Sequence, residues 1–455
     1  MAKITLGPII GKVTDTTARI LIEIDSDATV VCNATDNAGN TLEFSDNLKK
    51  NRPFAFALNG LQPNTEYKII FTGVDGSTPN SRVKTFESNT ERMNVAAVSC
   101  NFPSRNGEND MWGDLRDRFV VPNDVDLLLH VGDQVYGDSV FDKAMSIIRL
   151  NNPKGKKAQD EAISELYRGL YRKNWTEPTI RSVLANVSNL MIWDDHEIRD
   201  DWGSRADDSN PEKPAYRIGS LARDVYREYQ RQLWDDAFSS SAPTSSDEQH
   251  FHSWGKIGIL FVDQRGGRSF GKDNVRPYLG TRQWNDIVKQ LTGGELSKVR
   301  ALIVVTSVPL VYLSSSMTDL GDFLVNDLLD HWSHPKYTKE QIEMIRALRD
   351  WKDADDGQRE LLVVGGDVHV GANTDIKHNN KTIFRQLITS PITNHPPKTF
   401  LFIGLKSLIK DEARLSESYS FKHTNLTNLR NYGIIIVRVP PSGVPKVEGS
   451  LQKES

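Results

Sequence analysis

Five apolar runs after residue 94 end in residues that can bind metals or transfer protons. These runs are "VAAVSC", "LLLHVGDQVYGD", "LMIWDDHE", "ILFVDQRGGR" and "LLVVGGDVHVG". The polar residues at their ends are Cys100; Asp133, Tyr136 and Asp138; Asp194, Asp195, His196 and Glu197; Asp263, Arg265 and Arg268; and Asp367 and His369. Each residue alone has an ordinary structural explanation. Their repeated position at the end of an apolar run predicts that they converge on one metal site.

The residue types divide into two sets of metal ligands. A thiolate, a phenolate, an imidazole and a carboxylate suit Fe(III), with Zn²⁺ as a rival, and the chain offers them at Cys100, Tyr136, His369 and Asp133. An all-oxygen set suits Ca²⁺, Mg²⁺ or Mn²⁺, and consists of Asp133, Asp195 and Asp367. Asp133 belongs to both sets because one carboxylate has two oxygens. A pair of metals bridged in this way typically catalyses displacement at phosphorus.

The elements that position these residues have the pattern of an α/β (α+β) domain with one large sheet system, and we expect layered β-sheets flanked by helices. From residue 95 onward, apolar strands alternate with amphipathic segments, and helices are predicted over 158–175 and 338–353. Apolar runs of this kind are typical of strands that are covered on both faces. Ligands of such sheets collect at the carboxyl ends of the strands, where the polar residues lie.

The first 91 residues have a different pattern, with short alternating strands separated by turn residues. This pattern predicts a β-sandwich. The segment "LNGLQPNTEYKIIF" places Tyr67, Ile69 and Phe71 on one face and resembles the tyrosine-corner strand of fibronectin type III and immunoglobulin-like domains. The polar stretch at 87–94 reads as a linker. We therefore expect two domains, 1–91 and 92–455.

Composition excludes several classes of protein. The 455 residues carry a net charge of −4 and are 38% hydrophobic, without a polybasic run or an apolar stretch long enough for a bilayer. Neither a specific nucleic-acid partner nor a membrane span is expected. Two cysteines, Cys32 and Cys100, are too few for a disulfide scaffold. The sequence as given begins without an export signal, which favours the cytoplasm unless a signal has been removed. Oligomeric state stays open.

Three motifs together resemble a known family. "GDQVY", "WDDHE" and "GGDVH" resemble the calcineurin-like metallophosphoesterase pattern GDxxY, GNHE, GHxH in the form found in purple acid phosphatases. Two residues depart from that pattern, because Asp195 replaces the asparagine and Asp367 replaces the first histidine. These departures, with Ser99-Cys100 and "LITSPITN", are similar to PhoD-like alkaline phosphatases. The resemblance covers nearly the whole chain, since that family also carries an immunoglobulin-like N-terminal domain.

The resemblance implies a role for each matching residue. Cys100, Tyr136 and His369 match ligands of an iron ion, and Asp133 matches the bridging carboxylate. The remaining matches are two calcium ligands, Asp195 and Asp367, and a histidine that faces the leaving group, His196. Where purple acid phosphatases have a further histidine ligand, this chain has Thr306 and Ser307, which favours calcium over zinc at the second site.

Two further sets of residues have alternative interpretations. Asp138, Asp194 and Glu197 could hold an additional calcium ion, although orienting the ligands is the favoured role. Arg265 and Arg268 could clamp a phosphate, and the favoured alternative is an internal salt bridge.

The expected reaction is hydrolysis of phosphodiesters, phosphomonoesters or both by a metal-bound hydroxide, with His196 assisting the leaving group. The alternatives are a noncatalytic binding protein that metals stabilise and a nuclease with the same metal chemistry. The substrate is expected to be a small-molecule or polymeric phosphate ester. Two polar segments, 199–210 and 317–334, are candidates for selecting it. The acids of the first segment predict that diesters are hydrolysed at least as well as monoesters; they are Asp200, Asp201, Asp207 and Asp208.

Overall fold

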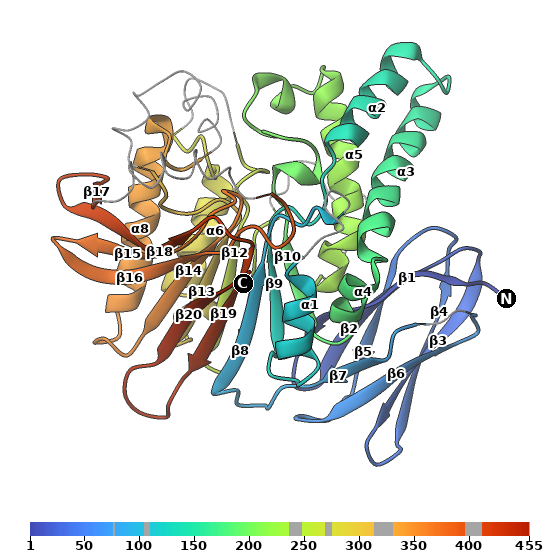
Figure 1. Ribbon diagram of the computed structural model, residues 1–455, viewed down its shortest axis with the longest axis horizontal. Helices are drawn as coiled ribbons and strands as arrows, with labels where there is room; N and C mark the ends of the chain where they lie inside the picture. The colour runs from blue at the N-terminus through green and yellow to red at the C-terminus, as the bar shows by residue number, and fades with distance from the viewer. Residues whose placement is uncertain are drawn as a thin grey trace.

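The computed structural model describes residues 1–75, 78–103, 110–235, 248–268, 275–313, 331–395 and 412–454. An all-β N-terminal part lies beside a larger α/β part, as Figure 1 shows. Across the described ranges, the helices are all too short or too polar to cross a membrane.

The N-terminal part consists of two antiparallel sheets, in agreement with the predicted all-β pattern. The first has the order β1 (Ile4–Val13), β2 (Thr17–Ile24), β5 (Phe54–Asn59). The second has the order β4 (Thr41–Leu48), β3 (Ala28–Asp36), β6 (Glu66–Thr72), β7 (Ser81–Lys84). The rings of Phe56 and Phe71, one from each sheet, lie 5.9 Å apart in the shared core. On β6, Tyr67 and Ile69 are buried, and the Tyr67 hydroxyl accepts a 2.8 Å hydrogen bond from the Gln62 amide, as a tyrosine corner requires.

The α/β part contains two sheets. The five-stranded sheet has the order β10 (Ser188–Ile192), β9 (Leu127–Val131), β8 (Arg92–Val98), β19 (Asn431–Arg438), β20 (Lys446–Lys453). The eight-stranded sheet has the order β11 (His250–Trp254), β12 (Ile257–Val262), β13 (Ala301–Thr306), β14 (Glu360–Gly365), β16 (Lys381–Ile388), β15 (Gly371–His378), β18 (Tyr419–Thr427), β17 (Ala413–Arg414). Strands β8 to β10 are parallel, and so are β12, β13, β14 and β16.

The predicted mixed α/β fold with layered sheets and helices is confirmed, but the prediction of one large sheet system is wrong, because the α/β part has two separate sheets. Strand β19 pairs with β8, and β20 pairs with β19 at the edge, so these two strands complete a separate sheet, which packs against the other through glycine positions. A Cβ atom at Gly433 would lie 2.8 Å from Leu387 Cδ2, and one at Gly449 would lie 3.0 Å from Leu362 Cδ2. The predicted linker is also too long, because β8 begins at Arg92 and its first three residues pair with β19.

Helices cover the outer faces of both sheets (Figure 1). Four helices lie beside the five-stranded sheet: α2 (Asp138–Leu150), α3 (Lys156–Trp175), α4 (Pro178–Leu184) and α5 (Pro214–Tyr229). The short helix α1 (Trp112–Leu115) continues into a π-helical turn, Arg116–Val120. The helices α6 (Thr281–Thr292) and α8 (Thr338–Asp353) cover the eight-stranded sheet. Short 3₁₀ turns occupy Asp195–Glu197, Ala206–Ser209, Arg231–Leu233, Glu295–Ser297 and Pro335–Tyr337. Both helices predicted from the sequence are confirmed.

Alternate residues of the central strands enter two different cores. On β13, Leu302 and Val304 pack under α6 and α8, whereas Ile303 and Val305 face the other sheet. Both faces of these strands are therefore buried, which explains their continuous apolar sequence. An ion pair also joins the N-terminal part to the α/β part, because the fully buried Glu23 of β2 lies 2.8 Å from Arg172 of α3.

Candidate metal centre

The carboxyl ends of four parallel strands bring the predicted ligands together. Cys100 follows β8, Asp133 follows β9, Asp195 follows β10, and Asp367 and His369 follow β14. Four of these five have a left-handed backbone, with φ of 56° at Cys100, 57° at Asp133, 62° at Asp367 and 52° at His369. Such φ values are uncommon outside glycine and often occur at functional sites. The chain turns sharply as it leaves each strand, and these turns aim the side chains at a common point.

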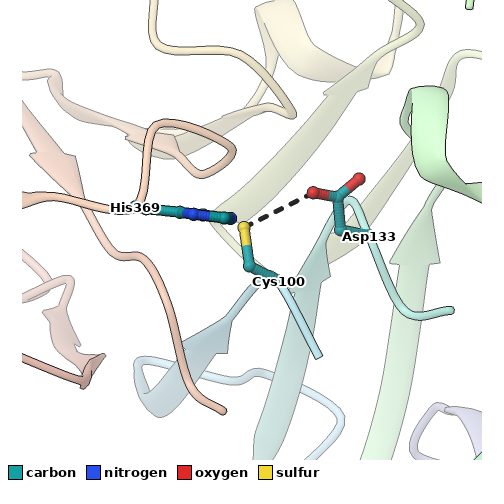
Figure 2. A group of neighbouring side chains, drawn as sticks. All are labelled: Cys100, Asp133 and His369. Carbon is teal, nitrogen blue, oxygen red and sulfur yellow. Dashed lines mark hydrogen bonds between the residues drawn. The ribbon is translucent and has the colours of Figure 1, made fainter. Parts of the chain in front are cut away.

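The first group of donors contains Cys100, Asp133 and His369, whose candidate ligand atoms lie within 4.8 Å of one another. Figure 2 shows the Cys100 sulfur between the His369 ring and the Asp133 carboxylate, 3.4 Å from Asp133 Oδ2. The Tyr136 hydroxyl completes the group at 3.3 Å from Asp133 Oδ2 and 3.4 Å from His369 Nε2. The structure therefore assembles all four donors of the predicted iron set.

The second group contains only carboxylates. Asp133, Asp194, Asp195 and Asp367 offer oxygens within 4.8 Å of one another, so Asp133 is common to both groups. This group includes the three acids of the predicted calcium set and adds Asp194. The groups are arranged as the sequence predicts, with one carboxylate between them.

The chemistry of these groups fits bound cations. Asp133 is buried, and its Oδ1 has no hydrogen-bond partner among the residues that the structure describes. Burial raises the pKa of Asp133, and the neighbouring carboxylates of Asp195 and Asp194 raise it further. Burial lowers the pKa of His369 to about 4, so its ring is neutral and has a lone pair to offer. A cation would satisfy the bare oxygen and offset the crowded negative charge.

Cys100 and Tyr136 require a cation in order to act as anionic ligands. Burial, together with the negative charge of Asp133, raises the pKa of the Cys100 thiol well above its ordinary value. The pKa of Tyr136 is raised by burial, Cys100 and Asp133. Both groups are therefore protonated in the absence of metal, and metal binding there would release protons.

His196 lies at the edge of both groups and contacts an acid that belongs to neither. Its ring lies over Tyr136, with the ring centroids 4.2 Å apart, and its Nδ1 is 3.0 Å from Asp138 Oδ2. Although burial lowers the pKa of His196, the carboxylates of Asp195, Asp133 and Asp138 outweigh it and raise the pKa above the ordinary value. Asp138 is the first residue of α2, and its Oδ1 accepts a 2.8 Å bond from the Asp200 amide. Each oxygen of the Asp138 carboxylate therefore has a hydrogen-bond partner, which fixes the position of this side chain.

Glu197 connects the loops that carry the ligands. Its Oε2 accepts hydrogen bonds from the backbone amides of Asp133 at 3.2 Å and Asp194 at 2.7 Å. Its Oε1 accepts from the Gln134 amide at 2.8 Å and from the Gln230 side chain at 3.1 Å. Both carboxylate oxygens of Glu197 are therefore occupied by donors from these loops and from Gln230, so orienting the ligands stays the favoured of its two predicted roles.

Asp194 and Arg265 form a buried ion pair behind the carboxylate group. The Arg265 guanidinium bonds Asp194 Oδ1 through Nε and Asp195 Oδ1 through Nη2, the latter at 3.1 Å. Ser307 Oγ donates to the same Asp194 oxygen at 2.8 Å. The side chain of Arg265 is fully buried, and these contacts are those of the internal salt bridge, the favoured of its two predicted roles. Arg268 donates from Nε to the Gln264 carbonyl at 2.6 Å.

The acidic segment 199–210 differs from its predicted role in one respect. Asp208 is buried, bonds Arg199 at 2.6 Å and accepts from the Gly203 amide at 3.0 Å, so its charge is used within the loop. Asp200 is the acid that borders the site, because its Oδ1 lies 3.6 Å from His196 Nε2. Most of the second predicted segment, 317–330, lies outside the described residues.

Three contacting residues were not predicted individually. Ser390 Oγ lies 3.0 Å from Cys100 Sγ and accepts from the His369 amide, and Asn394 Nδ2 lies 3.4 Å from His369 Nε2. Both belong to the "LITSPITN" segment, which was recognised only as a whole. His331 Nε2 lies 3.3 Å from Asp367 Oδ2. It does not follow an apolar run, so the strand-end criterion could not identify it.

Comparisons with known proteins identify the fold and the family of the chain. A solved structure described as "Structure of PhoD" superposes with a TM-score of 0.70 and 14% sequence identity, covering 99% of this chain and 92% of that chain. An uncharacterized protein of Saccharomyces cerevisiae, YGR266W, is 23% identical over 389 residues, which cover 68% of this chain and 54% of the relative. The match thus spans about half the length of that curated relative. The family model of the PhoD-like phosphatases matches residues 95–444, and the chain therefore belongs to the PhoD-like phosphatase family.

Proposed function

We propose that this chain is a metal-dependent hydrolase of phosphate esters with two adjacent metal sites. The single observation that carries the proposal is the position of Asp133, which is common to a mixed sulfur, nitrogen and oxygen donor group and to a group of carboxylates. One carboxylate between two such groups is the arrangement that a pair of catalytic metals uses at phosphorus.

The donor types favour different metals at the two sites. Cys100, Asp133, Tyr136 and His369 would hold Fe(III), with zinc as the alternative. Asp133, Asp195 and Asp367 would hold calcium, with manganese and magnesium as alternatives. When bound, these ions supply the Lewis acid that activates water and neutralises phosphoryl oxygens.

His196 is the proposed general acid for the leaving group. Asp138 accepts a hydrogen bond from Nδ1–H, so Nε2 of the protonated ring carries a second proton to donate. The raised pKa of His196 supports this protonated form. Asp138 belongs to neither the mixed group nor the carboxylate group, so its charge continues to favour the imidazolium when bound metal ions neutralise the ligands. The side chain of His196 is 17% exposed, which leaves it accessible to a substrate oxygen.

The charge around His196 favours phosphodiesters. Asp200 lies beside Nε2 and is 71% exposed, so it would repel the second negative charge of a monoester. A diester carries only one charge on its phosphoryl group. We therefore propose that diesters are hydrolysed at least as well as monoesters.

The proposal is tested by measuring p-nitrophenol release from p-nitrophenyl phosphate and bis-p-nitrophenyl phosphate near pH 8. We expect hydrolysis that is lost on chelation and restored by iron with calcium. Protein that binds its metals and hydrolyses neither ester would contradict the proposal and favour a noncatalytic binding protein. Plasmid cleavage at a higher kcat/KM than either small ester would instead favour the nuclease alternative.

A further inference from the structure

A cavity of about 380 Å³ lies next to the metal centre, between α5, the loop after β12 and the beginning of α6. We call it the basic cavity, and its defining residues are Trp202, Arg223, Arg265, Arg268, Thr281 and Arg282. None of the residues proposed as metal ligands lines it. Arg265 relates the two sites, because it lines the cavity and its guanidinium bonds Asp194 and Asp195.

The lining of the basic cavity carries more positive than negative charge. Among the described residues that line it are four arginines and one acid, Asp208, which bonds Arg199. The carboxylate that Arg223 contacts, Glu248, is shared with two more arginines, Arg227 and Arg231, at 2.7 and 2.8 Å. Arg227 and Arg231 also pair with Asp224 at 3.4 Å and Asp235 at 2.7 Å, so this cluster is close to neutral, and the basic character of the cavity comes from the excess of arginines over acids among the described residues that line it.

Backbone groups at the cavity also favour an anion. Helix α6 begins there, and its N-cap is Gly280, which has a φ of 76° and no side chain to cap the helix. The first turn of α6 contains no acidic residue. The first backbone N–H groups of an α-helix have no partner within the helix and point out of its N-terminus. Together with the helix dipole, they stabilise negative charge there.

The cavity walls combine this charge with aromatic surface. Trp193, Trp202 and Tyr216 line it, and the guanidinium of Arg223 lies 4.9 Å from the Trp193 ring. Arg223, Arg265 and Arg268 are each less than one-tenth exposed, at 6%, 3% and 8%. Electrostatic attraction to an anion is stronger at such partly desolvated arginines than at surface lysines or arginines.

We propose that the basic cavity binds a phosphate-type oxyanion. One source is a second phosphate group, carried by the ester whose phosphorus reacts at the metal centre; this form rests on the proposed function. The other source is free inorganic phosphate. In either form the bound anion lies beside Arg265, the residue that holds two carboxylates of the metal centre.

Two matched synthetic diesters test the first form. They are p-nitrophenyl 3-phosphopropyl phosphate and p-nitrophenyl 3-hydroxypropyl phosphate, which differ only in the terminal phosphate. For the metal-loaded wild-type chain, we expect kcat/KM for the phosphopropyl ester to be about tenfold higher or more, as one or two charge-assisted hydrogen bonds predict. The ratio should fall to about two in Arg268→Gln and in Arg282→Gln.

The variants are chosen so that a folding defect cannot hide the result. Arg268 is nearly buried, but Arg282 is exposed at the start of α6, so Arg282→Gln changes charge without changing the core. Arg346→Gln is the matched control, because Arg346 is also exposed, on α8, and does not line the cavity. It should keep the wild-type ratio.

Equilibrium dialysis with radiolabelled inorganic phosphate separates the two sources. If the two esters have nearly equal kcat/KM and both cavity variants weaken the binding of inorganic phosphate, the cavity is assigned to free phosphate. A ratio near one without such a site overturns the inference, provided that the hydroxypropyl ester is hydrolysed. If neither ester is hydrolysed, the proposed function fails, and dialysis alone decides whether the cavity binds phosphate.

Discussion

Replacing His196 should slow the reaction most for esters with poor leaving groups. A general acid typically contributes about 10²–10⁴-fold, which is about 2.7–5.4 kcal/mol at 1.36 kcal/mol per decade. We therefore expect His196→Ala to lose that factor on methyl alkyl phosphates. The loss on methyl p-nitrophenyl phosphate should be about tenfold or less, because p-nitrophenolate departs without protonation.

Asp138→Asn provides a graded form of the same experiment. Asp138 accepts a 3.0 Å bond from His196, and a hydrogen bond between charged groups is worth about 1.5–3 kcal/mol. The side chain of Asp138 is 44% exposed, so screening places the effect at the lower end, about tenfold in kcat. Asparagine preserves the shape and removes the charge.

The assay is kcat for the two methyl esters at saturating metal, with metal content measured on the same samples. His196 also lies within 4.8 Å of Asp133 and Asp195, so metal content decides whether it is a ligand. Equal losses for both leaving groups, or loss of a metal ion from His196→Ala, would refute its assignment as the general acid.

Three further predictions concern the metal ligands and their supports. The purified protein should show a visible charge-transfer band from phenolate and thiolate to Fe(III), and Tyr136→Phe should shift or remove it; colourless, fully active protein containing only zinc would disprove the iron assignment. Glu197→Ala should lower the free energy of unfolding by about 4 kcal/mol or more, because four buried donors lose an acceptor worth about 1–3 kcal/mol each. Urea titration measures this loss, and a loss below about 1 kcal/mol would contradict the role of Glu197 in connecting the ligand loops. Asp208→Asn should destabilise the loop that Arg199 holds, whereas Asp207→Asn, which is exposed, should alter neither stability nor the ratio of diester to monoester hydrolysis.

The location of the candidate site was predictable from the sequence because strand ends are local features. A run such as "LLLHVGD" reveals both the buried strand and the residue that follows it, and the carboxyl ends of parallel strands meet at one edge. Asp133, Asp195 and Asp367 could therefore be grouped without knowledge of their contacts. The sandwich was predictable for a similar reason, since alternation along each strand is written in adjacent residues.

Long-range partners were not predictable in the same way. The division into two sheets depends on the pairing of β19 with β8, which lies more than 330 residues earlier, and the sequence pattern carries no signal of that pairing. The choice between a phosphate clamp and a salt bridge for Arg265 depended on whether Asp194 lies within reach. Likewise, the sequence shows that Asp208 carries a negative charge, but it does not show that Asp208 forms an ion pair with Arg199.

The most direct test of the account is the metal content of Asp133→Asn beside that of the wild-type chain, measured by elemental analysis after reconstitution with iron and calcium. Because both donor groups share Asp133, we expect at least two metal ions per wild-type chain and the weakening of both sites in the variant, with loss of bis-p-nitrophenyl phosphate hydrolysis. A variant that retains both ions and wild-type turnover would contradict the shared centre.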